Sequence, residues 1–137
     1  MLKREKRSGI IFVASIAADF IIPCHGIYSA SKAFVDHFGK CLAHENPHKI
    51  DVLSYKPNLV QSNMVPLESS FGVLTIKEAA SSALDKLGWD IETEGNWRHV
   101  LMNVPPKLTR WLLPQSVDME RQRRYITSLD KQVKAAE

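Results

Sequence analysis

The sequence has little of what marks several classes of protein. It has two cysteines in 137 residues, Cys24 and Cys41, which are too few for a disulfide-stabilised fold and favour a reducing compartment. No apolar run reaches the roughly 18 residues that a membrane span needs. Eighteen Lys and Arg against fifteen Asp and Glu leave a formal charge of +3, an excess too small to indicate nucleic acid as a partner.

The composition otherwise lies near the globular average, with 45% hydrophobic residues. A chain of this length can bury one core but not two, so we expect a single domain over residues 1–137. Basic residues 3–7 followed by apolar residues 10–14 imitate a signal peptide, but no small-residue cleavage pattern follows. A buried strand explains the apolar run better, and we interpret residues 3–7 as the solvated end of a helix.

The first sixty residues predict a strand, a helix and a second strand. Residues 10–14 are a continuous apolar run of strand length, which is typical of a parallel sheet covered by helices. A helical pattern follows over residues 27–45 and ends at Asn46-Pro47. Residues 50–55 form the next strand, which Pro57 stops. This order predicts a right-handed βαβ unit and an α/β fold.

The second half of the chain is less regular. Residues 61–72 lack periodicity and are predicted to form a loop. Thr75 and Glu78 form a capping box that opens a helix ended by Gly88. Residues 99–102 resemble a short strand, Pro105-Pro106 opens a short turn or helix, and residues 116–136 are polar and helix-prone.

Three side chains have the spacing of a proton-transfer site. Tyr28 and Lys32 are four residues apart and share one helix face, where the ammonium stabilises the phenolate. A tyrosine in that state can give a proton to a ketone or take one from an alcohol. Ser15 follows the first strand at its carboxyl end, where open α/β sheets bind ligands. Its hydroxyl can hold the reacting oxygen beside Tyr28.

The stretch from residue 9 to residue 64 resembles the catalytic half of the short-chain dehydrogenase/reductase family. The matching pieces are residues 9–15, residues 28–34 and residues 56–64. Within the family, the chain is most similar to the hydroxysteroid dehydrogenase and very-long-chain oxoacyl-CoA reductase branch. The resemblance implies a partial Rossmann-type three-layer sandwich, mostly parallel, without the N-terminal nucleotide-binding strands. Residues 9–64 would be the catalytic βαβ core, and residues 65–137 the substrate loop and C-terminal helices.

The resemblance also implies roles for single residues. Ser15 would polarise the substrate oxygen, Tyr28 would be the general acid and base, and Lys32 would assist Tyr28 and bind the nicotinamide ribose. The reaction would be hydride transfer between NADP(H), or less readily NAD(H), and a lipid or steroid carbonyl or alcohol. The other residues assigned to the cofactor are Pro57, Asn58, Val60 and Ser62, and those assigned to the substrate mouth are Cys24 and His25.

The sequence departs from the family pattern at the cofactor. It contains no Gly-x-x-x-Gly-x-Gly and no Asn-Asn-Ala-Gly, and Pro57-Asn58 stands where Pro-Gly is usual. Three interpretations follow: a part of a longer protein, a chain completed by a partner, or a chain that has lost activity. The alternative to an oxidoreductase is therefore a degenerate, non-catalytic subunit or interaction module. The missing strands would leave an open apolar sheet edge that invites a partner.

Some further features can be explained either by ordinary packing or by a specific function. A stripe of His37, Cys41, His44 and His48 imitates a metal site, but we expect no metal there and favour a helix face or a subunit interface on helix 27–45. The run Trp111 to Leu113 either packs internally or touches a membrane surface. The family branch implies association with the endoplasmic reticulum.

Overall fold

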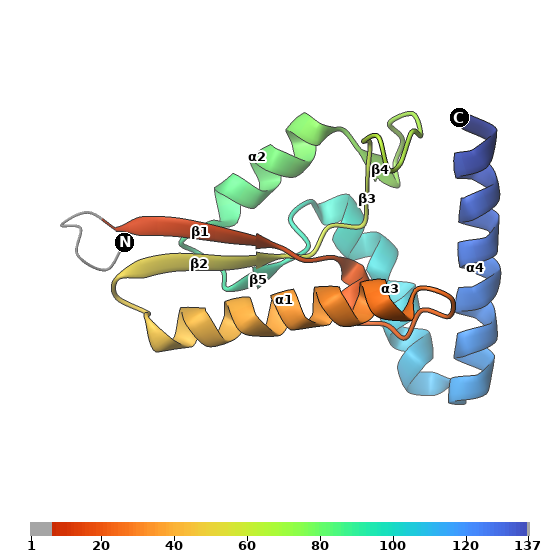
Figure 1. Cartoon of the computed structure of the whole chain (residues 1–137), viewed down its shortest axis with the longest axis horizontal. Helices are drawn as coiled ribbons and strands as arrows, with labels where there is room; N and C mark the ends of the chain where they lie inside the picture. Colours follow the sequence, from red (N-terminus) through yellow and green to blue (C-terminus); the bar gives the residue numbers. More distant parts are fainter. Residues whose placement is uncertain (1–6, 137) are drawn as a thin grey trace.

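The computed structural model describes residues 7–136, so the Lys3–Lys6 part of the basic run lies outside the described residues. Figure 1 shows a small sheet between two helices, with two further helices across one end. The elements are β1 (Ser8–Val13), the 3-10 helix η1 (Ile16–Ala18), α1 (Gly26–Glu45), β2 (Ile50–Tyr55), β3 (Leu59–Val60), β4 (Val73–Leu74), α2 (Ile76–Lys86), β5 (Glu92–Thr93), α3 (Trp97–Leu112) and α4 (Gln115–Ala136). None of the described helices is both long and apolar enough to cross a membrane.

The predicted βαβ unit is confirmed. β1 and β2 pair in parallel from Ser8 opposite Ile50 to Val13 opposite Tyr55, and α1 connects them. β5 pairs in parallel with the end of β2, which gives the strand order β1-β2-β5, while β3 and β4 form a separate two-stranded parallel sheet. α1 covers one face and α2 the other, so the predicted three-layer α/β arrangement is present (Figure 1).

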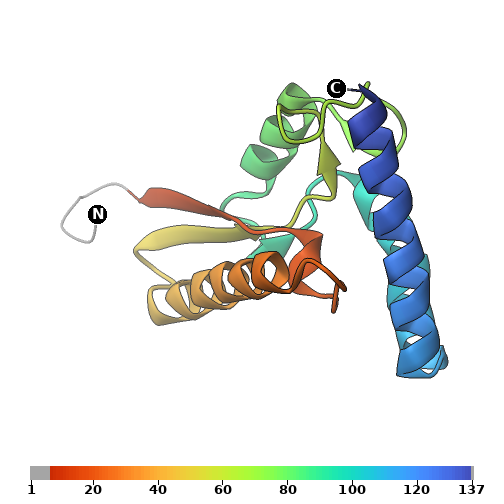
Figure 2. The ribbon, with the colours of Figure 1, turned by 45° about the vertical axis from the view of Figure 1, so that its right-hand side comes forward.

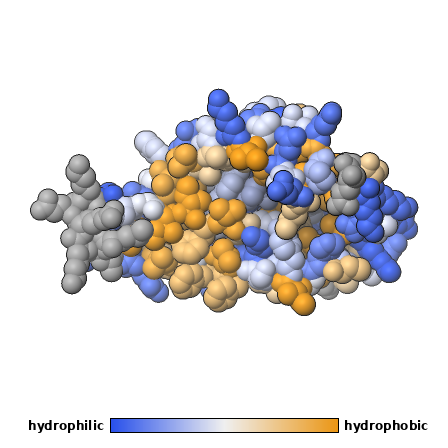
Figure 3. All heavy atoms as spheres, turned by 45° about the horizontal axis from the view of Figure 1, so that its top comes forward, coloured by the Kyte–Doolittle hydropathy of each residue, from blue (hydrophilic) through white to orange (hydrophobic). Residues whose placement is uncertain are grey.

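β2 is the central strand and β1 is an edge in the described part of the chain. Val52, Leu53, Ser54 and Tyr55 are all buried, because β2 is covered on both faces. β1 pairs on one side only, and its last residue, Val13, is 57% exposed. Figure 3 shows apolar side chains gathered over β1 on this side of the molecule. The predicted open, apolar edge is therefore present.

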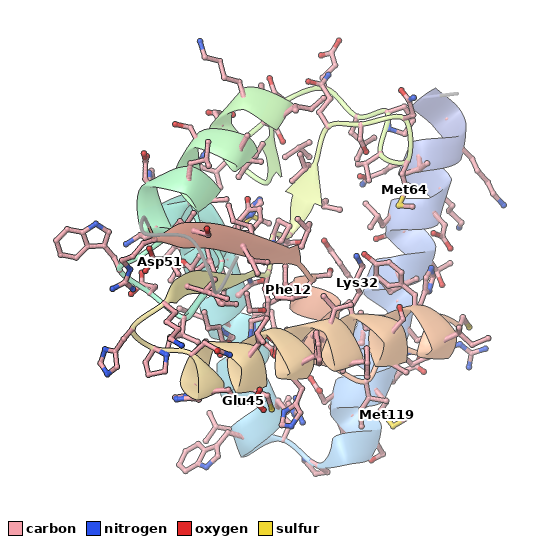
Figure 4. All side chains as sticks on the ribbon, turned by 60° about the vertical axis from the view of Figure 1, so that its left-hand side comes forward. Phe12, Lys32, Glu45, Asp51, Met64 and Met119 are labelled. Carbon is pink, nitrogen blue, oxygen red and sulfur yellow. The ribbon has the colours of Figure 1, made fainter. Side chains whose placement is uncertain are left out.

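Close packing sets the position of α1 on the sheet. The rings of Phe12 and Phe38 meet edge to face with centroids 5.6 Å apart. A Cβ atom at Gly39 would lie 3.0 Å from the Phe12 ring, so glycine allows the helix to approach this closely. Figure 4 shows Phe12 directed from β1 towards α1. The approach fixes the height of the whole helix above the strand.

The structure confirms the capping box of α2 and corrects the region after it. Residues 99–102 are not a strand but part of α3, and Pro105-Pro106 lies inside this helix rather than at its start. Asn96 supplies the helix start that the prediction missed, since its side chain accepts a hydrogen bond from the backbone N–H of Arg98 at 3.0 Å. The polar tail is helical, as predicted, over α4.

A buried lysine holds together the elements that surround the end of the sheet. Lys56 is 2% exposed, and its Nζ donates to Asp19 at 2.8 Å and pairs with Glu92 of β5. Burial alone would lower the pKa of Lys56, but the bonds to the two carboxylates outweigh burial and raise the pKa. Lys40 of α1 joins the same network by pairing with Glu92 and with Asp36. The network thus links α1, β2, β5 and the loop after η1.

Replacing this lysine tests the network. We expect Lys56→Met to lower the free energy of unfolding by about 2–4 kcal/mol, because it leaves partly buried carboxylates without their counter-ion. The matched control is Lys86→Met, whose partner Asp90 lies 3.4 Å away in an exposed i,i+4 pair; it should cost within about 0.5 kcal/mol. Urea unfolding measures both. Equal losses in the two variants would contradict the structural role of the network.

A second polar network anchors α3 to the turn after β2. The backbone N–H of Asn58 donates to Nδ1 of the buried His99 at 3.1 Å, and the Asn58 side chain donates to Asn103 at 3.2 Å. Asn103 in turn donates to the buried carboxylate of Glu94 at 2.6 Å, which also pairs with Lys107. Asn58 is therefore held by two residues of α3 that sit one turn apart.

The burial of His99 in this network predicts that the fold loses stability in acid. Burial lowers the pKa of His99. The backbone of Leu59 and Gly72 and the carboxylate of Glu94 oppose this lowering only in part, and the nearby charge of Arg98 adds to it. His99 stays neutral in the fold, whereas the unfolded chain takes up a proton as the pH falls below about 6.5. The stabilisation is thus complete above that pH and lost below it, with a slope of at most about 1.4 kcal/mol per pH unit.

Urea unfolding across this pH range provides the measurement. His99→Gln should flatten the slope, and His48→Gln, in the exposed turn after α1, should leave it unchanged. A slope that survives in the His99 variant would show that another group titrates.

Candidate functional site

The carboxyl ends of the three parallel strands meet at one edge of the sheet. In Figures 1 and 2, η1, the start of α1, α3 and α4 lie beyond this edge, and α4 runs across the end of the sheet. Ligands of open α/β sheets bind outside this edge. The predicted site residues can therefore be located relative to it.

Ser15 lies directly beyond the end of β1. Its Oγ accepts a hydrogen bond from the N–H of Ala17 at 3.2 Å and so caps η1. The backbone on each side is fixed, since Ala14 donates to the carbonyl of Tyr55 at 2.8 Å and Ile16 donates to the carbonyl of Pro57 at 3.1 Å. As the Oγ serves this cap as an acceptor, its own O–H is left to donate to a ligand.

Tyr28 and Lys32 lie in the first two turns of α1. The Nζ of Lys32 donates to the carbonyl oxygen of Val13 at 3.1 Å and stands 5.7 Å from the centre of the Tyr28 ring. Figure 4 shows Lys32 pointing from α1 towards the end of β1. Tyr28 is 39% exposed, so its ring can meet a ligand. The hydrogen bond to Val13 brings the helix face that carries Tyr28 to the end of the strand that precedes Ser15.

The residues predicted to hold a cofactor follow β2, and they differ in how many of their polar groups are left to bind a ligand. The carbonyl of Pro57 is bonded to the Ile16 N–H, and the backbone N–H and amide nitrogen of Asn58 are committed to α3. Val60 lies in β3 and is half-buried, and Ser62 is exposed in a bridge with Val65. Asn58 thus has only its amide oxygen left for a ligand.

A cavity of about 370 Å³ opens beside Ile16, the residue after Ser15. Its walls come from the loop after η1, the Asn58 turn, α3 and α4, and include Phe20, Ile22, Met102 and Tyr125. Burial raises the pKa of Tyr125. Cys24 and His25 precede α1 and are not among these lining residues, so their contact with substrate stays a prediction. Sequence reasoning missed the α4 residues, because nothing in their polar pattern indicates a cavity.

One group of carboxylates also converges near this edge. Ligand atoms of Asp19, Asp36 and Glu92 lie within 4.8 Å of one another. Lys40 and Lys56 pair with these carboxylates, and the hydroxyl of Ser54 donates to Asp36 at 2.6 Å. The two ammonium groups offset two of the three negative charges, which explains the convergence as a structural network.

Comparison with known proteins agrees with the geometry. The sequence model of the family described as short chain dehydrogenase matches residues 1–70. Hydroxysteroid dehydrogenase-like protein 1 of Gallus gallus is 33% identical over 116 residues, covering 79% of this chain and 35% of the relative. Very-long-chain 3-oxoacyl-CoA reductase of Mus musculus is 32% identical over 112 residues, covering 79% and 36%. The chain thus spans about a third of the length of these relatives.

Two solved structures share the fold. One, from work on 7β-hydroxysteroid dehydrogenase stereoselectivity, superimposes with a TM-score of 0.65 at 19% identity, covering 83% of this chain and 45% of that chain. The other is a short chain dehydrogenase from Burkholderia cenocepacia J2315 in complex with NADP, with a TM-score of 0.59 at 25% identity, covering 77% and 47%. Together with the match over residues 1–70, these findings show that the chain belongs to the short-chain dehydrogenase family of oxidoreductases.

Proposed function

We propose that the chain carries the catalytic residues of an NADP(H)-dependent oxidoreductase that interconverts a carbonyl and an alcohol on a lipid or steroid. Substrates of the 3-oxoacyl-CoA type belong to this class. The observation that carries the proposal is the hydrogen bond from Lys32 to Val13, which joins the Tyr28 face of α1 to the end of β1 beside Ser15. This contact supports the proposal that the three residues, which are spaced apart in the sequence, act as one site.

The three residues divide the proton chemistry. The Ser15 O–H donates to the carbonyl oxygen of the substrate and holds it in place. The Tyr28 phenol gives its proton to that oxygen in reduction and takes it back in oxidation. The Lys32 ammonium stabilises the phenolate left by this transfer, and its remaining N–H groups would hold the nicotinamide ribose. When bound, the nicotinamide supplies or accepts the hydride.

We infer that residues of this chain would hold one half of such a cofactor. Lys32, Pro57 and Val60 lie around the carboxyl edge, where a nicotinamide would bind, and Ser62 follows at the surface. The sequence has no glycine-rich turn to cradle the pyrophosphate, so we propose that groups outside these 137 residues hold that part. NADP(H) is the proposed cofactor because a structural relative was solved with NADP, and NAD(H) is the alternative.

The substrate class rests on the cavity and on the relatives. The names of the relatives refer to hydroxysteroids and to very-long-chain 3-oxoacyl-CoA. The largely apolar walls beside Ile16 suit either a steroid ring system or an acyl chain. Association with the endoplasmic reticulum or with a membrane surface through the exposed Trp111 stays a prediction.

Single substitutions test the assignment. We expect Tyr28→Phe to lower kcat for NADPH-dependent reduction of a steroid ketone by about 10²–10⁴-fold, because no other group then delivers the proton. Tyr55→Phe, the matched control in β2, should keep the rate. The assay follows loss of NADPH absorbance together with formation of the alcohol. Undiminished turnover in Tyr28→Phe would remove Tyr28 as the acid and base.

The open edge of β1 favours a second function, that of an interaction module. Val13 at the end of β1 and Phe34 on α1 are exposed, and β1 is unpaired on its outer side among the described residues. A partner strand could cover this edge. A stable complex that forms equally with Tyr28→Phe and shows no turnover would support this second function over the first.

A further inference from the structure

One side of α3 carries a continuous row of exposed apolar side chains. Because a helix turns once in about 3.6 residues, positions three, four and seven residues apart lie on one face. Six such residues, each at least 47% exposed, form what we call the α3 stripe: Val100, Leu101, Val104, Leu108, Trp111 and Leu112. A helix in a globular fold normally turns its apolar face to the core, so an outward apolar face indicates an interaction surface.

The opposite side of α3 is already used inside the molecule. Met102 and Pro106 line the cavity described above. His99 and Asn103, both buried, are hydrogen-bonded to Asn58. These bonds fix the rotation of the helix, so the α3 stripe cannot turn inward. α3 also follows β5, which lies at the other edge of the sheet from β1, so a strand that pairs with β1 is a poor cover for the stripe.

The charge of α3 argues against a second copy of the chain as the cover. Residues 95–117 contain no Asp or Glu. α3 itself carries Arg98, Lys107 and Arg110. Two α3 helices packed stripe to stripe would bring these cations together, and neither helix has a carboxylate to pair with them. The phosphates of a lipid surface are acceptors, so a bilayer presents no such conflict.

Tryptophan stands at both ends of the apolar row. Trp97 continues the row at the start of α3, where it packs edge to face on Phe71 with ring centroids 5.7 Å apart. Trp111, near the end of α3, is 81% exposed. An indole ring combines apolar surface with an N–H donor, and it is favoured where hydrocarbon meets polar headgroups. A face with Trp and Leu on a helix that also carries Lys and Arg is typical of a helix lying in a membrane surface.

We propose that the α3 stripe docks on the surface of a lipid bilayer, with α3 lying in the plane of the interface and the stripe among the acyl chains. The sequence indicates only the run Trp111 to Leu113, and the structure extends this surface over the length of α3. Because the other side of α3 lines the cavity, docking brings the cavity within one helix diameter of the lipid. The inference concerns binding, and it holds whether or not the chain turns over a substrate.

Binding of the full chain to vesicles tests the proposal. The vesicles are phosphatidylcholine with about 30 mol% phosphatidylserine, and flotation separates bound from free chain. We expect Leu108→Ser combined with Trp111→Ser to weaken binding by about tenfold or more, because apolar surface is lost from the contact with the acyl chains. The matched control, Leu84→Ser combined with Trp89→Ser, removes the same residue types from exposed positions outside the stripe and should leave binding unchanged.

Tryptophan fluorescence gives a second measurement that does not depend on the serine variants. The chain has three tryptophans, so Trp89→Phe combined with Trp97→Phe leaves Trp111 alone. We expect vesicles to shift the emission of Trp111 to shorter wavelength and brominated lipid to quench it. When Trp97→Phe and Trp111→Phe leave Trp89 alone, vesicles should not change the emission.

Three results would each overturn the proposal: no flotation of the unsubstituted chain, equal losses of binding in the two double variants, or an emission of Trp111 that vesicles do not change. A dimer in sedimentation velocity that Leu108→Ser with Trp111→Ser dissociates, without vesicle binding, would also overturn it and assign the stripe to a second copy. None of these measurements involves turnover of NADPH, so a failure of the proposed function leaves their results standing.

Discussion

The buried ion pairs of Lys56 are the interaction on which the site depends. Lys56 directly follows the central strand, and the next two residues form the Pro57-Asn58 turn. Its ammonium binds Asp19 after η1 and Glu92 of β5, and Lys40 extends the network to α1. A charge with 2% exposure is stable only when such partners surround it. The network therefore fixes α1, β5 and the loop after η1 relative to the end of β2.

A second set of hydrogen bonds, from α3, holds the Pro57-Asn58 turn. His99 and Asn103 hold Asn58, so α3 is tied to the residues that follow β2. The side chain of Asn58 bonds to Asn103 of α3, which a glycine at this position could not do. The cavity beside Ile16 lies between this turn and α4. The carboxyl edge of the sheet and the wall of the cavity are thus connected through Asn58.

The sequence was most informative where local pattern and fold agree. The apolar strands, the Asn46-Pro47 stop and the Thr75–Glu78 box predict elements that the structure contains, because each depends on neighbours within a few residues. The spacing of Ser15, Tyr28 and Lys32 predicts one site, and the structure brings Lys32 to the end of β1.

The sequence was least informative where contacts between residues far apart in the chain decide the structure. Residues 99–102 were predicted as a strand, yet they are helical, with His99 facing Asn58 across 41 positions of the chain. The cavity-lining residues of α4 could not be predicted either, because parts of the chain far from α4 form the rest of the cavity. Gln122 is an ordinary residue of a polar helix until folding places it against the cavity and Asp118.

We propose that Lys32, Pro57 and Val60 lie in the nicotinamide half of a reductase site. The most direct test is a nuclear magnetic resonance titration of the chain with two fragments of the cofactor, reduced nicotinamide mononucleotide and 2′,5′-ADP. We expect saturable shifts at Lys32 and Val60 with the nicotinamide fragment and none with the adenine fragment. Shifts with the adenine fragment alone, or no shifts with either fragment, would show that these residues do not bind the nicotinamide.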